Sequence, residues 1–451
     1  MSLLGSGRTL TRECAFWDKL LPLTIANAIQ NTAFYRGLYA DRSLGAGFSL
    51  ADLPGLPIVT REMLRKSGSS SVARNLTCAA IQNTSGTSGT AIFLHRSAEE
   101  FAFIEAFFSQ AFAAPANSGA RPLVLVLCNI GHGVHTPVPL PVFVLQSDLI
   151  SLNQIHRPLA YLARDYDLEG VAPRVSSIVG TVSQLNVLTH YLCEHGHREL
   201  MEPIREIFLT SEYVTPANRL WLEQRWGNVE IRNRYSMSEC FGGATYCKHC
   251  DGFHFDPVIV PELVDFKSDK EDGAPLGRLI VTALFPFVQM QPIIRYQSDD
   301  IFRLDEATCS RPSFRYFGRI SQTLFDPLDN RMVVLPGATL DDVLDETDNV
   351  ARVPTFEGSL AAPFSGEPIT IGEVRTEGGL RRFDLVVAMT QISHNEKQAR
   401  DIEEKLLERC PTLRRLVSSG EARFTVTAVH QDSVSRSTFD KTTRSIWVER
   451  Q

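Results

Sequence analysis

The chain has 451 residues, of which 43% are hydrophobic and 22% charged, proportions that are ordinary for a soluble globular protein. This length predicts two or three domains and is ample for a large buried core. The net charge of −7 and the absence of a basic block argue against a nucleic acid as a partner.

The first residues, MSLLGSGRTLTREC, contain no cationic segment followed by a long apolar run, so we expect no signal peptide. The most apolar stretches, 101–112 and 123–128, are too short or too polar at their edges to span a bilayer, and no membrane partner is expected. A cytoplasmic protein is the expectation that follows. The sequence leaves the oligomeric state open, a homodimer included.

The first half of the chain alternates helical and strand-like segments. Apolar residues at helical spacing predict an opening helix within 14–40, and Thr60 is placed to cap a second helix. Further strands are expected over 78–82, 123–128, 207–209 and 229–231. Further helices are expected over 97–113 and 181–195, and another is expected to end at 221–226. This alternation predicts an α/β core of layered subdomains with a largely parallel sheet.

From about residue 253 onward the pattern changes to closely spaced strands, which predicts a β-rich subdomain. The expected strands are 258–264, 278–283, 293–296 and 314–317. The remainder predicts a small α+β unit with strands over 382–389 and 422–429 around a charged helix over 395–410. We therefore expect a large N-terminal domain over 1–320 and a small C-terminal domain over 321–451.

The segment Asn83–Thr90 holds five hydroxyl residues and two glycines in eight positions, between a short strand and a helix. Glycines let the backbone turn tightly, and the loop amides and hydroxyls can then surround phosphate oxygens. A flexible linker has a similar composition. The segment does not match the Walker pattern of ordinary nucleotide-binding loops.

This loop resembles the phosphate-binding motif of the adenylate-forming superfamily, and four further segments match motifs of that superfamily in the same order. They are RYSMSE at 234–239, GRLIVTAL at 277–284 with RYQSDD at 295–300, GRIS at 318–321, and SRSTFDK at 435–441. Within the superfamily, NTAFYR at 31–36, LPIVTRE at 56–62 and the chain length are similar to the phenylacetate–CoA ligase branch.

The resemblance implies that the chain uses ATP to activate a carboxylic acid, of aryl or arylacetic type, as an acyl-AMP. The acyl group would then pass to a thiol, that of CoA first, with a carrier-protein thiol or an amine as the alternative acceptor. A pseudoenzyme that keeps only nucleotide binding is the less favoured alternative. The small domain is expected to rotate about Ser321 between the two half-reactions.

The resemblance also assigns roles to single residues. Glu239 would hold Mg²⁺, Lys441 would place its ammonium against the α-phosphate, and Asp300 would accept hydrogen bonds from the ribose. Tyr235 would stack on adenine, and Arg319 would support the ribose or phosphate. The other nucleotide-contacting positions are Thr84, Ser85, Gly86, Thr87, Ser88 and Gly89 on the β- and γ-phosphates, Ser236 and Ser238 beside Tyr235, and Ser211 and Glu212 at the acyl pocket.

Each assignment has a structural alternative. Glu239 and Lys441 are residue types that are common on solvated surfaces, and Asp300 beside Asp299 could cap a turn. The sequence also departs from the family pattern. Thr90 and Ala91 replace a Lys–Pro pair, Ser321 replaces an Asp or Lys, and Asp299 and Asp440 replace glycines. These departures concern the rate and the acceptor more than nucleotide binding.

Substrate contacts are weakly marked. Gly180 could admit the flat body of an acid, but a glycine before a helix is an equal explanation. His132 and His135 lie in a Gly/Pro-rich loop and could line the acyl pocket, although such histidines are more often surface groups.

Cys247, Cys250 and His254 follow a Cys-x2-Cys-x3-His pattern, the spacing of zinc ligands. Related ligases carry a Cys-x-Cys-Gly after the ribose aspartate, where this chain has Cys309, and the resemblance supplies that residue as the fourth ligand. A closed tetrahedral zinc site would tie the strand-rich subdomain together. Buried cysteines that pack as small hydrophobic residues are the alternative.

Overall fold

The computed structural model describes residues 11–42, 44–45, 47–83, 92–109, 120–127, 142–147, 154–267, 275–305, 309, 311–353, 362–391, 395–434 and 447–449. The predicted phosphate-loop residues 84–89, the loop histidines His132 and His135, and Lys441 lie outside this set. In the described part of the chain, no helix combines the length and the apolar character needed to cross a bilayer.

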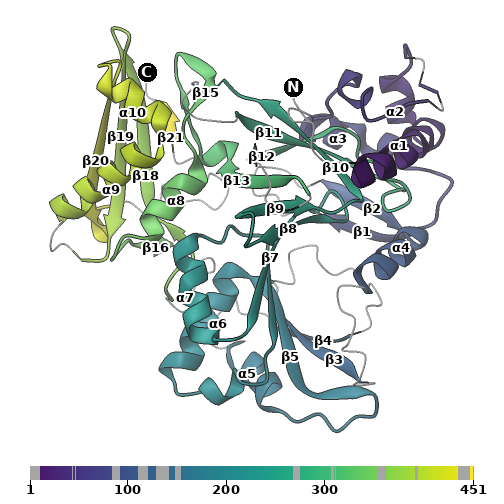
Figure 1. Cartoon of the computed structure of the whole chain (residues 1–451), viewed down its shortest axis with the longest axis horizontal. Helices are drawn as coiled ribbons and strands as arrows, with labels where there is room; N and C mark the ends of the chain where they lie inside the picture. The colour runs from purple at the N-terminus through teal and green to yellow at the C-terminus, as the bar shows by residue number, and fades with distance from the viewer. Residues whose placement is uncertain are drawn as a thin grey trace.

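A sheet of eleven described strands runs through the larger part of the molecule, in the order β10-β11-β12-β13-β9-β8-β7-β6-β5-β3-β4 (Figure 1). The section from β7 to β4 is parallel, and the section from β7 to β10 is antiparallel. The strands are β3 (Arg121–Leu127), β4 (Phe143–Ser147), β5 (Val171–Thr181), β6 (Glu206–Thr210), β7 (Glu230–Ser236), β8 (Gly243–Cys247), β9 (Gly252–Phe255), β10 (Ile259–Asp265), β11 (Leu276–Ala283), β12 (Tyr296–Asp305) and β13 (Ser313–Arg319).

Four helices of this part begin at a capping threonine. Threonine side chains at positions 32, 60, 181 and 215 each accept a hydrogen bond from a backbone N–H in the first turn of the helix that follows. The prediction for Thr60 is thereby confirmed. The helices are α1 (Thr11–Asn31), α2 (Ala33–Leu38), α3 (Arg61–Ser67), α4 (Ala98–Ser109), α5 (His156–Ala163), α6 (Val182–Glu194) and α7 (Pro216–Trp226).

A smaller four-stranded sheet, in the order β20-β19-β18-β21, lies on the far side of α8 from the parallel strands (Figure 1). Helices α9 and α10 pack against β20. The elements after residue 320 are β14 (Leu324–Asp326), β15 (Asp329–Leu335), α8 (Gly337–Asp345), β16 (Arg352–Val353), β17 (Glu367–Pro368), β18 (Thr370–Glu377), β19 (Leu380–Met389), α9 (Asn395–Arg409), α10 (Pro411–Ser418), β20 (Ala422–His430) and β21 (Trp447–Glu449).

Three buried hydrophobic clusters accompany these layers. The first joins α1 and α2 to the antiparallel strands, and the second lies between α5–α7 and the parallel strands. The third contains buried residues from position 324 onward. The predicted α/β class, with a large N-terminal part and a small α+β C-terminal part, is confirmed by this architecture.

One predicted strand is wrong. Residues 293–296 were expected to form a strand, but β12 begins at Tyr296 and continues to Asp305. The physical reason is Arg295, whose φ of 48° turns the chain just before the strand. The apolar run of Ile293 and Ile294 belongs instead to the first cluster, where both side chains are fully buried.

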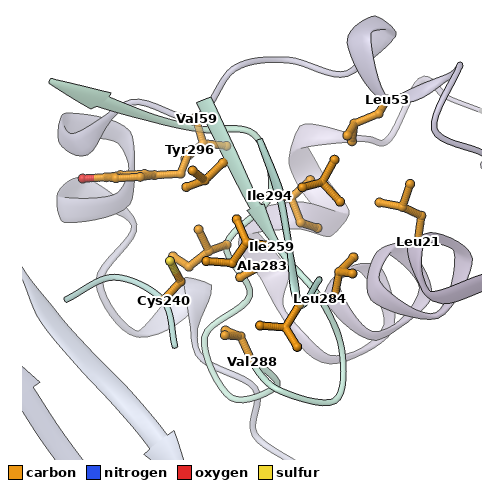
Figure 2. Close-up of a cluster of buried hydrophobic side chains, with 14 of the residues drawn as sticks. Leu21, Leu53, Val59, Cys240, Ile259, Ala283, Leu284, Val288, Ile294 and Tyr296 are labelled. Atoms are coloured by element: carbon orange, nitrogen blue, oxygen red, sulfur yellow. The ribbon is translucent and has the colours of Figure 1, made fainter. Parts of the chain in front are cut away.

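Arg295 is itself buried and clamps three segments together. Its Nε donates to Glu262 Oε2 on β10 at 3.1 Å, and its NH1 group donates to the carbonyls of Pro54 and Leu56. Val59 N–H in turn donates to the Arg295 carbonyl at 2.9 Å. Figure 2 shows Val59 and Tyr296 side by side at the edge of the first cluster.

We predict that Arg295→Met lowers the free energy of unfolding by about 3–5 kcal/mol, because it leaves the Glu262 carboxylate buried without its cation. Adding Glu262→Leu should recover part of the loss. Arg174→Met, which breaks the exposed Arg174–Asp165 pair, is the control and should cost no more than about 1 kcal/mol. Urea unfolding followed by fluorescence tests this, and an equal cost for both single variants would contradict it.

Candidate nucleotide site and metal cluster

Three motif residues converge at one edge of the central sheet. The Tyr235 hydroxyl, at the end of β7, donates to Asp300 Oδ2 at 2.7 Å. Arg319 is the ladder partner of Asp300 across β12 and β13, and its Nε lies 3.7 Å from Asp300 Oδ1. The fold therefore brings together residues that three separate motifs predicted to share a site.

The Asp300 carboxyl group lies in a mostly buried position, with 15% of its side chain exposed. Burial raises its pKa above the ordinary value for aspartate, while Arg319 and the Tyr235 hydrogen bond act in the opposite direction. Burial also raises the pKa of Tyr235 well above its ordinary value, so Tyr235 remains the hydrogen-bond donor. When ionised, Asp300 keeps lone pairs that can accept from the hydroxyls of a bound ligand.

The Tyr235 ring is packed rather than loosely exposed. It makes edge-to-face contacts with Phe302 at 5.1 Å and Phe255 at 6.0 Å between ring centroids, and a tilted contact with Tyr316. These aromatic neighbours fix the ring in place, so its hydroxyl is aimed at Asp300. The neighbouring Ser236 is exposed, and its hydroxyl lies 2.9 Å from that of Thr210.

Glu239, the predicted magnesium ligand, is 6% exposed and is held from two sides. The Tyr296 hydroxyl donates to Glu239 Oε1 at 2.9 Å, and Arg61 NH1 lies 3.7 Å from the same oxygen. Figure 2 shows the Tyr296 hydroxyl pointing away from the aliphatic side chains of the cluster. The second carboxylate oxygen, Oε2, has no hydrogen-bond donor among the described residues, and a carboxylate oxygen is the ligand that Mg²⁺ prefers.

Backbone contacts hold the loop around Glu239. The fully buried Arg96 donates from NH2 to the carbonyls of Ser238 and Glu239, both at 3.0 Å. The Ser238 side chain itself is exposed. Sequence reasoning missed Arg61 and Arg96 and treated Tyr296 only as part of a motif. A single sequence does not reveal these contacts, because the only indication of them is that the residues lie next to or within a recognised motif.

Ser211 and Glu212 follow β6 at the same end of the sheet. Ser211 is exposed and has a φ of 70°, a conformation that is uncommon for a residue with a side chain. Glu212 Oε2 accepts from the backbone N–H of Ser183 at 2.7 Å and from its hydroxyl at 2.8 Å, so it caps the start of α6. Gly180 fills a packing role, because a Cβ there would lie 3.0 Å from Leu127 Cβ.

The segment after β13 connects to the smaller sheet. Ser321 is exposed in a single 3₁₀ turn, Ile320–Gln322. Gly318 has a φ of 105°, and a Cβ at this position would lie 2.7 Å from Ala338 N. Only glycine therefore lets the strand pass this close to the start of α8.

The four predicted zinc ligands come together at one end of the antiparallel strands. The ligand atoms of Cys247, Cys250, His254 and Cys309 all lie within 4.8 Å of one another. Cys247 Sγ and Cys309 Sγ are 3.7 Å apart, close to the roughly 3.8 Å that tetrahedral zinc with Zn–S bonds of about 2.3 Å requires.

His254 is oriented as a ligand would be. Its Nδ1 lies 2.7 Å from the carbonyl oxygen of Pro312, and its Nε2 is buried without a hydrogen-bond partner among the described residues. A backbone carbonyl on one ring nitrogen is the usual way in which proteins orient a metal-binding histidine. The residues present therefore fit a zinc ion.

Comparisons with known proteins give structural matches only. No protein-family model matches the sequence, and no curated protein matches it significantly. The structure is similar to that of a 2-hydroxyisobutyryl-CoA ligase in the postadenylation state, with a TM-score of 0.65, 15% identity, and coverage of 100% of this chain and 94% of the ligase.

Two further structures have similar folds. An acyl acid amido synthetase matches with a TM-score of 0.57 and 14% identity, over 94% of this chain and 88% of that one. An O-succinylbenzoate coenzyme A synthetase from Bacillus subtilis, in complex with AMP, matches with a TM-score of 0.50 and 14% identity, over 82% and 68%. This chain therefore has the fold of the adenylate-forming enzymes, as its motifs predict.

Proposed function

We propose that this chain is an adenylate-forming ligase of the phenylacetate–CoA ligase-like type, which activates an aryl or arylacetic acid with ATP and passes the acyl group to CoA. The observation that carries the proposal is the Tyr235–Asp300–Arg319 network. It joins three motifs that the resemblance assigns to one nucleotide site. The structural neighbours support the same chemistry.

In the first half-reaction, a carboxylate oxygen of the acid forms a bond to the α-phosphorus of ATP, and the bond to pyrophosphate breaks. In the second half-reaction, the thiol sulfur attacks the acyl carbon, AMP leaves with the bonding electrons, and the thiol proton passes to solvent. The phosphoryl transition state is highly anionic, so fixed donors and cations lower its energy more than a base would.

The described residues divide this work. Asp300 accepts hydrogen bonds from the ribose hydroxyls, Tyr235 holds Asp300 and stacks on the adenine, and Arg319 balances the Asp300 charge. Glu239 holds Mg²⁺, which would neutralise phosphate oxygens when bound. Ser211, Glu212, Ser236 and Ser238 would form the wall around the nucleotide.

The remaining roles rest on sequence motifs alone. Residues 84–89 would bind the β- and γ-phosphates, and Lys441 would contact the α-phosphate and the carboxylate of the acid. In this proposal, residues 1–320 form the adenylation domain, and residues 321–451 form a mobile domain that turns about Ser321 and delivers Lys441. The exposure of Ser321 in a single short turn supports a pivot there.

The acceptor could instead be an amine. The observation that favours this second candidate is the similarity to an acyl acid amido synthetase over 94% of this chain. The departures at Ser321 and Asp440 from the family pattern leave the acceptor open. A carrier-protein thiol is the third acceptor that the same chemistry allows.

We also propose that Cys247, Cys250, His254 and Cys309 hold a structural zinc ion. The site joins the β8–β9 turn to the segment between β12 and β13. Four protein ligands leave no open position, so the ion would stabilise the antiparallel strands and take no part in the chemistry.

We expect wild-type protein to catalyse ATP–pyrophosphate exchange that depends on an aryl or arylacetic acid, and to release AMP when CoA is added. Lys441→Ala should reduce exchange by about 10²–10³-fold, because it removes a cation from the transition state. ATP affinity by calorimetry should change little. Lys405→Ala, in an exposed ion pair on α9, is the control and should behave as wild type.

The outcomes of this assay separate the alternatives. Normal exchange by Lys441→Ala would move the catalytic cation elsewhere. AMP release with an amine or a carrier protein, but not with CoA, would show that CoA is not the acceptor and would identify the one that is. ATP binding without exchange for any acid of an aryl, arylacetic and aliphatic panel would favour a nucleotide-binding protein that does not react.

A second prediction concerns Asp300 and pH. The pKa of Asp300 is raised in the folded state, so the folded protein binds this proton more tightly than the unfolded chain does. The contribution of Asp300 to the free energy of unfolding therefore falls as the pH rises from the ordinary aspartate pKa through the raised pKa. Asp300→Asn should therefore be more stable than wild type at neutral pH. It should also bind ATP about 10–100-fold more weakly, because it loses hydrogen bonds to a charged acceptor.

Thermal melts from pH 4 to 8 and ATP titrations test both parts. Asp167→Asn, at an exposed aspartate between α5 and β5, is the control, and neither property should change in it. Unchanged ATP affinity in Asp300→Asn would show that Asp300 does not bind the nucleotide.

For the metal, elemental analysis should find about one zinc per chain. Cys247→Ser should lower both zinc content and the melting temperature, whereas Cys78→Ser, at an exposed cysteine outside the cluster, should change neither. A well-folded wild-type protein without metal would refute the zinc proposal.

A further inference from the structure

Arg96 is the largest of the fully buried side chains, and it belongs to β2 (Phe93–Ser97), which pairs with β1 (Cys78–Asn83) as an antiparallel hairpin. Its NH2 group donates to the carbonyls of Ser238 and Glu239. The guanidinium also lies over the Phe241 ring, 4.5 Å from the centroid. One buried cation thus contacts the chain on both sides of the Glu239 side chain.

This arrangement carries an energetic cost. Nε and NH1 of Arg96 are buried without hydrogen-bond partners among the described residues. Unpaired buried donors destabilise the folded state, and an apolar residue at a buried charged position is often neutral or stabilising. Net stability therefore does not account for an arginine at this position.

The charge of the buried Glu100 favours a cation nearby, but it does not explain where the hydrogen bonds of that cation go. Glu100 is fully buried near Arg96, but backbone N–H groups already satisfy both of its carboxylate oxygens. Oε2 accepts from Ser97 at 2.5 Å, and Oε1 accepts from Gln289 at 2.5 Å and from Met290 at 3.0 Å. The directed hydrogen bonds of Arg96 go to the Ser238 and Glu239 backbone instead.

We propose that Arg96 is a positioning residue for Glu239: its guanidinium fixes the 238–239 backbone, and with it the direction in which the Glu239 carboxylate presents Oε2 to a divalent cation. Tyr296 and Arg61 hold Oε1 from the side-chain end, and Arg96 holds the main-chain end. This role rests on the proposed function, in which Glu239 holds Mg²⁺. In this role Arg96 acts through the backbone of residues 238 and 239.

The test compares wild type, Arg96→Lys and Arg96→Met by calorimetric ATP binding and by ATP–pyrophosphate exchange at stepped Mg²⁺ concentrations. Residues that orient a metal ligand typically affect metal affinity by about 10–100-fold. We expect Arg96→Met to raise the Mg²⁺ concentration for half-maximal exchange by about tenfold or more, with the KM of the acid changed less than about twofold. Arg96→Lys keeps a donor for the two carbonyls. It should therefore shift the Mg²⁺ concentration for half-maximal exchange about half as far, on a logarithmic scale, as Arg96→Met does.

Arg381→Met is the matched control, because Arg381 is also largely buried and donates to Asp326 in the C-terminal part. It should lower the melting temperature without moving the Mg²⁺ dependence. A wild-type Mg²⁺ dependence in folded Arg96→Met, or in Arg96→Lys if Arg96→Met does not fold, would overturn the positioning role. An equal shift in Arg381→Met would also overturn it.

The two proposals fail in different ways. Wild-type protein that shows no Mg²⁺-dependent ATP binding would overturn the proposed function and the role of Arg96 with it. A normal wild type with unaffected Arg96 variants would overturn only the role of Arg96.

Discussion

The buried ion pair between Arg295 and Glu262 is the constraint on which the candidate site depends. Both side chains are almost completely buried, with 4% and 1% of their surfaces exposed. In such a place the pair cannot separate without leaving an uncompensated charge, and the carbonyls of Pro54 and Leu56 accept hydrogen bonds from NH1 of the guanidinium. The pair therefore fixes where the N-terminal segment meets β10 and where β12 begins.

The beginning of β12 determines the geometry of the site. The pairing of β12 with β11 is irregular between Gln297 and Ile301, so hydrogen bonds rather than simple strand alternation position Ser298 and Asp300. Tyr296 reaches Glu239, and Ser298 bonds to the Leu279 carbonyl on β11 and accepts from the Asp300 N–H. Asp300 reaches Tyr235 on β7. One strand thus connects both carboxylates of the proposed site.

The same region explains why Val59 matters to residues more than 200 positions away. Val59 forms a parallel bridge to Tyr296, with backbone hydrogen bonds to Arg295 and Gln297 on either side. Arg61 therefore reaches Glu239 from a helix that starts two residues after the bridge. Glu239 is held by three distant parts of the chain, with Arg61 and Tyr296 at its carboxylate and Arg96 at its backbone carbonyl. Such contacts would hold the proposed metal ligand in a fixed orientation.

The sequence predicted what is local or encoded in a recognisable motif. Helix starts followed from capping residues such as Thr60, and the meeting of Tyr235 with Asp300 followed from the order of the motifs. The start of β12 could not be predicted, because an apolar run is interrupted at Arg295, which combines a positive φ with an ion pair to the distant Glu262. Arg96 was missed for a similar reason, since its partners lie 142 and 143 positions away.

The contacts between the two parts of the chain are compatible with the proposed rotation. Tyr213 donates to Asp342 at 3.1 Å and Thr215 to Asp345 at 2.5 Å, and both carboxylates belong to α8. Water can replace such polar contacts at a small net cost, because each protein hydrogen bond is exchanged for one to solvent. One apolar contact between the two parts comes from Phe364, whose ring packs edge-to-face on Trp221 at 5.8 Å.

Separation of the two parts would also expose the edge-to-face contact between Phe266 and Phe325, whose ring centroids lie 5.4 Å apart. The buried residues of the third cluster come from position 324 onward, so that core stays intact when the smaller part moves. The hydrophobic effect scales with the apolar area transferred to water, and the described aromatic contacts between the two parts are Trp221 with Phe364 and Phe266 with Phe325. The proposed rotation would have to break these contacts together with the Lys267–Asp329 ion pair and the backbone hydrogen bond from Lys267 to Arg331, while each part keeps a buried core of its own.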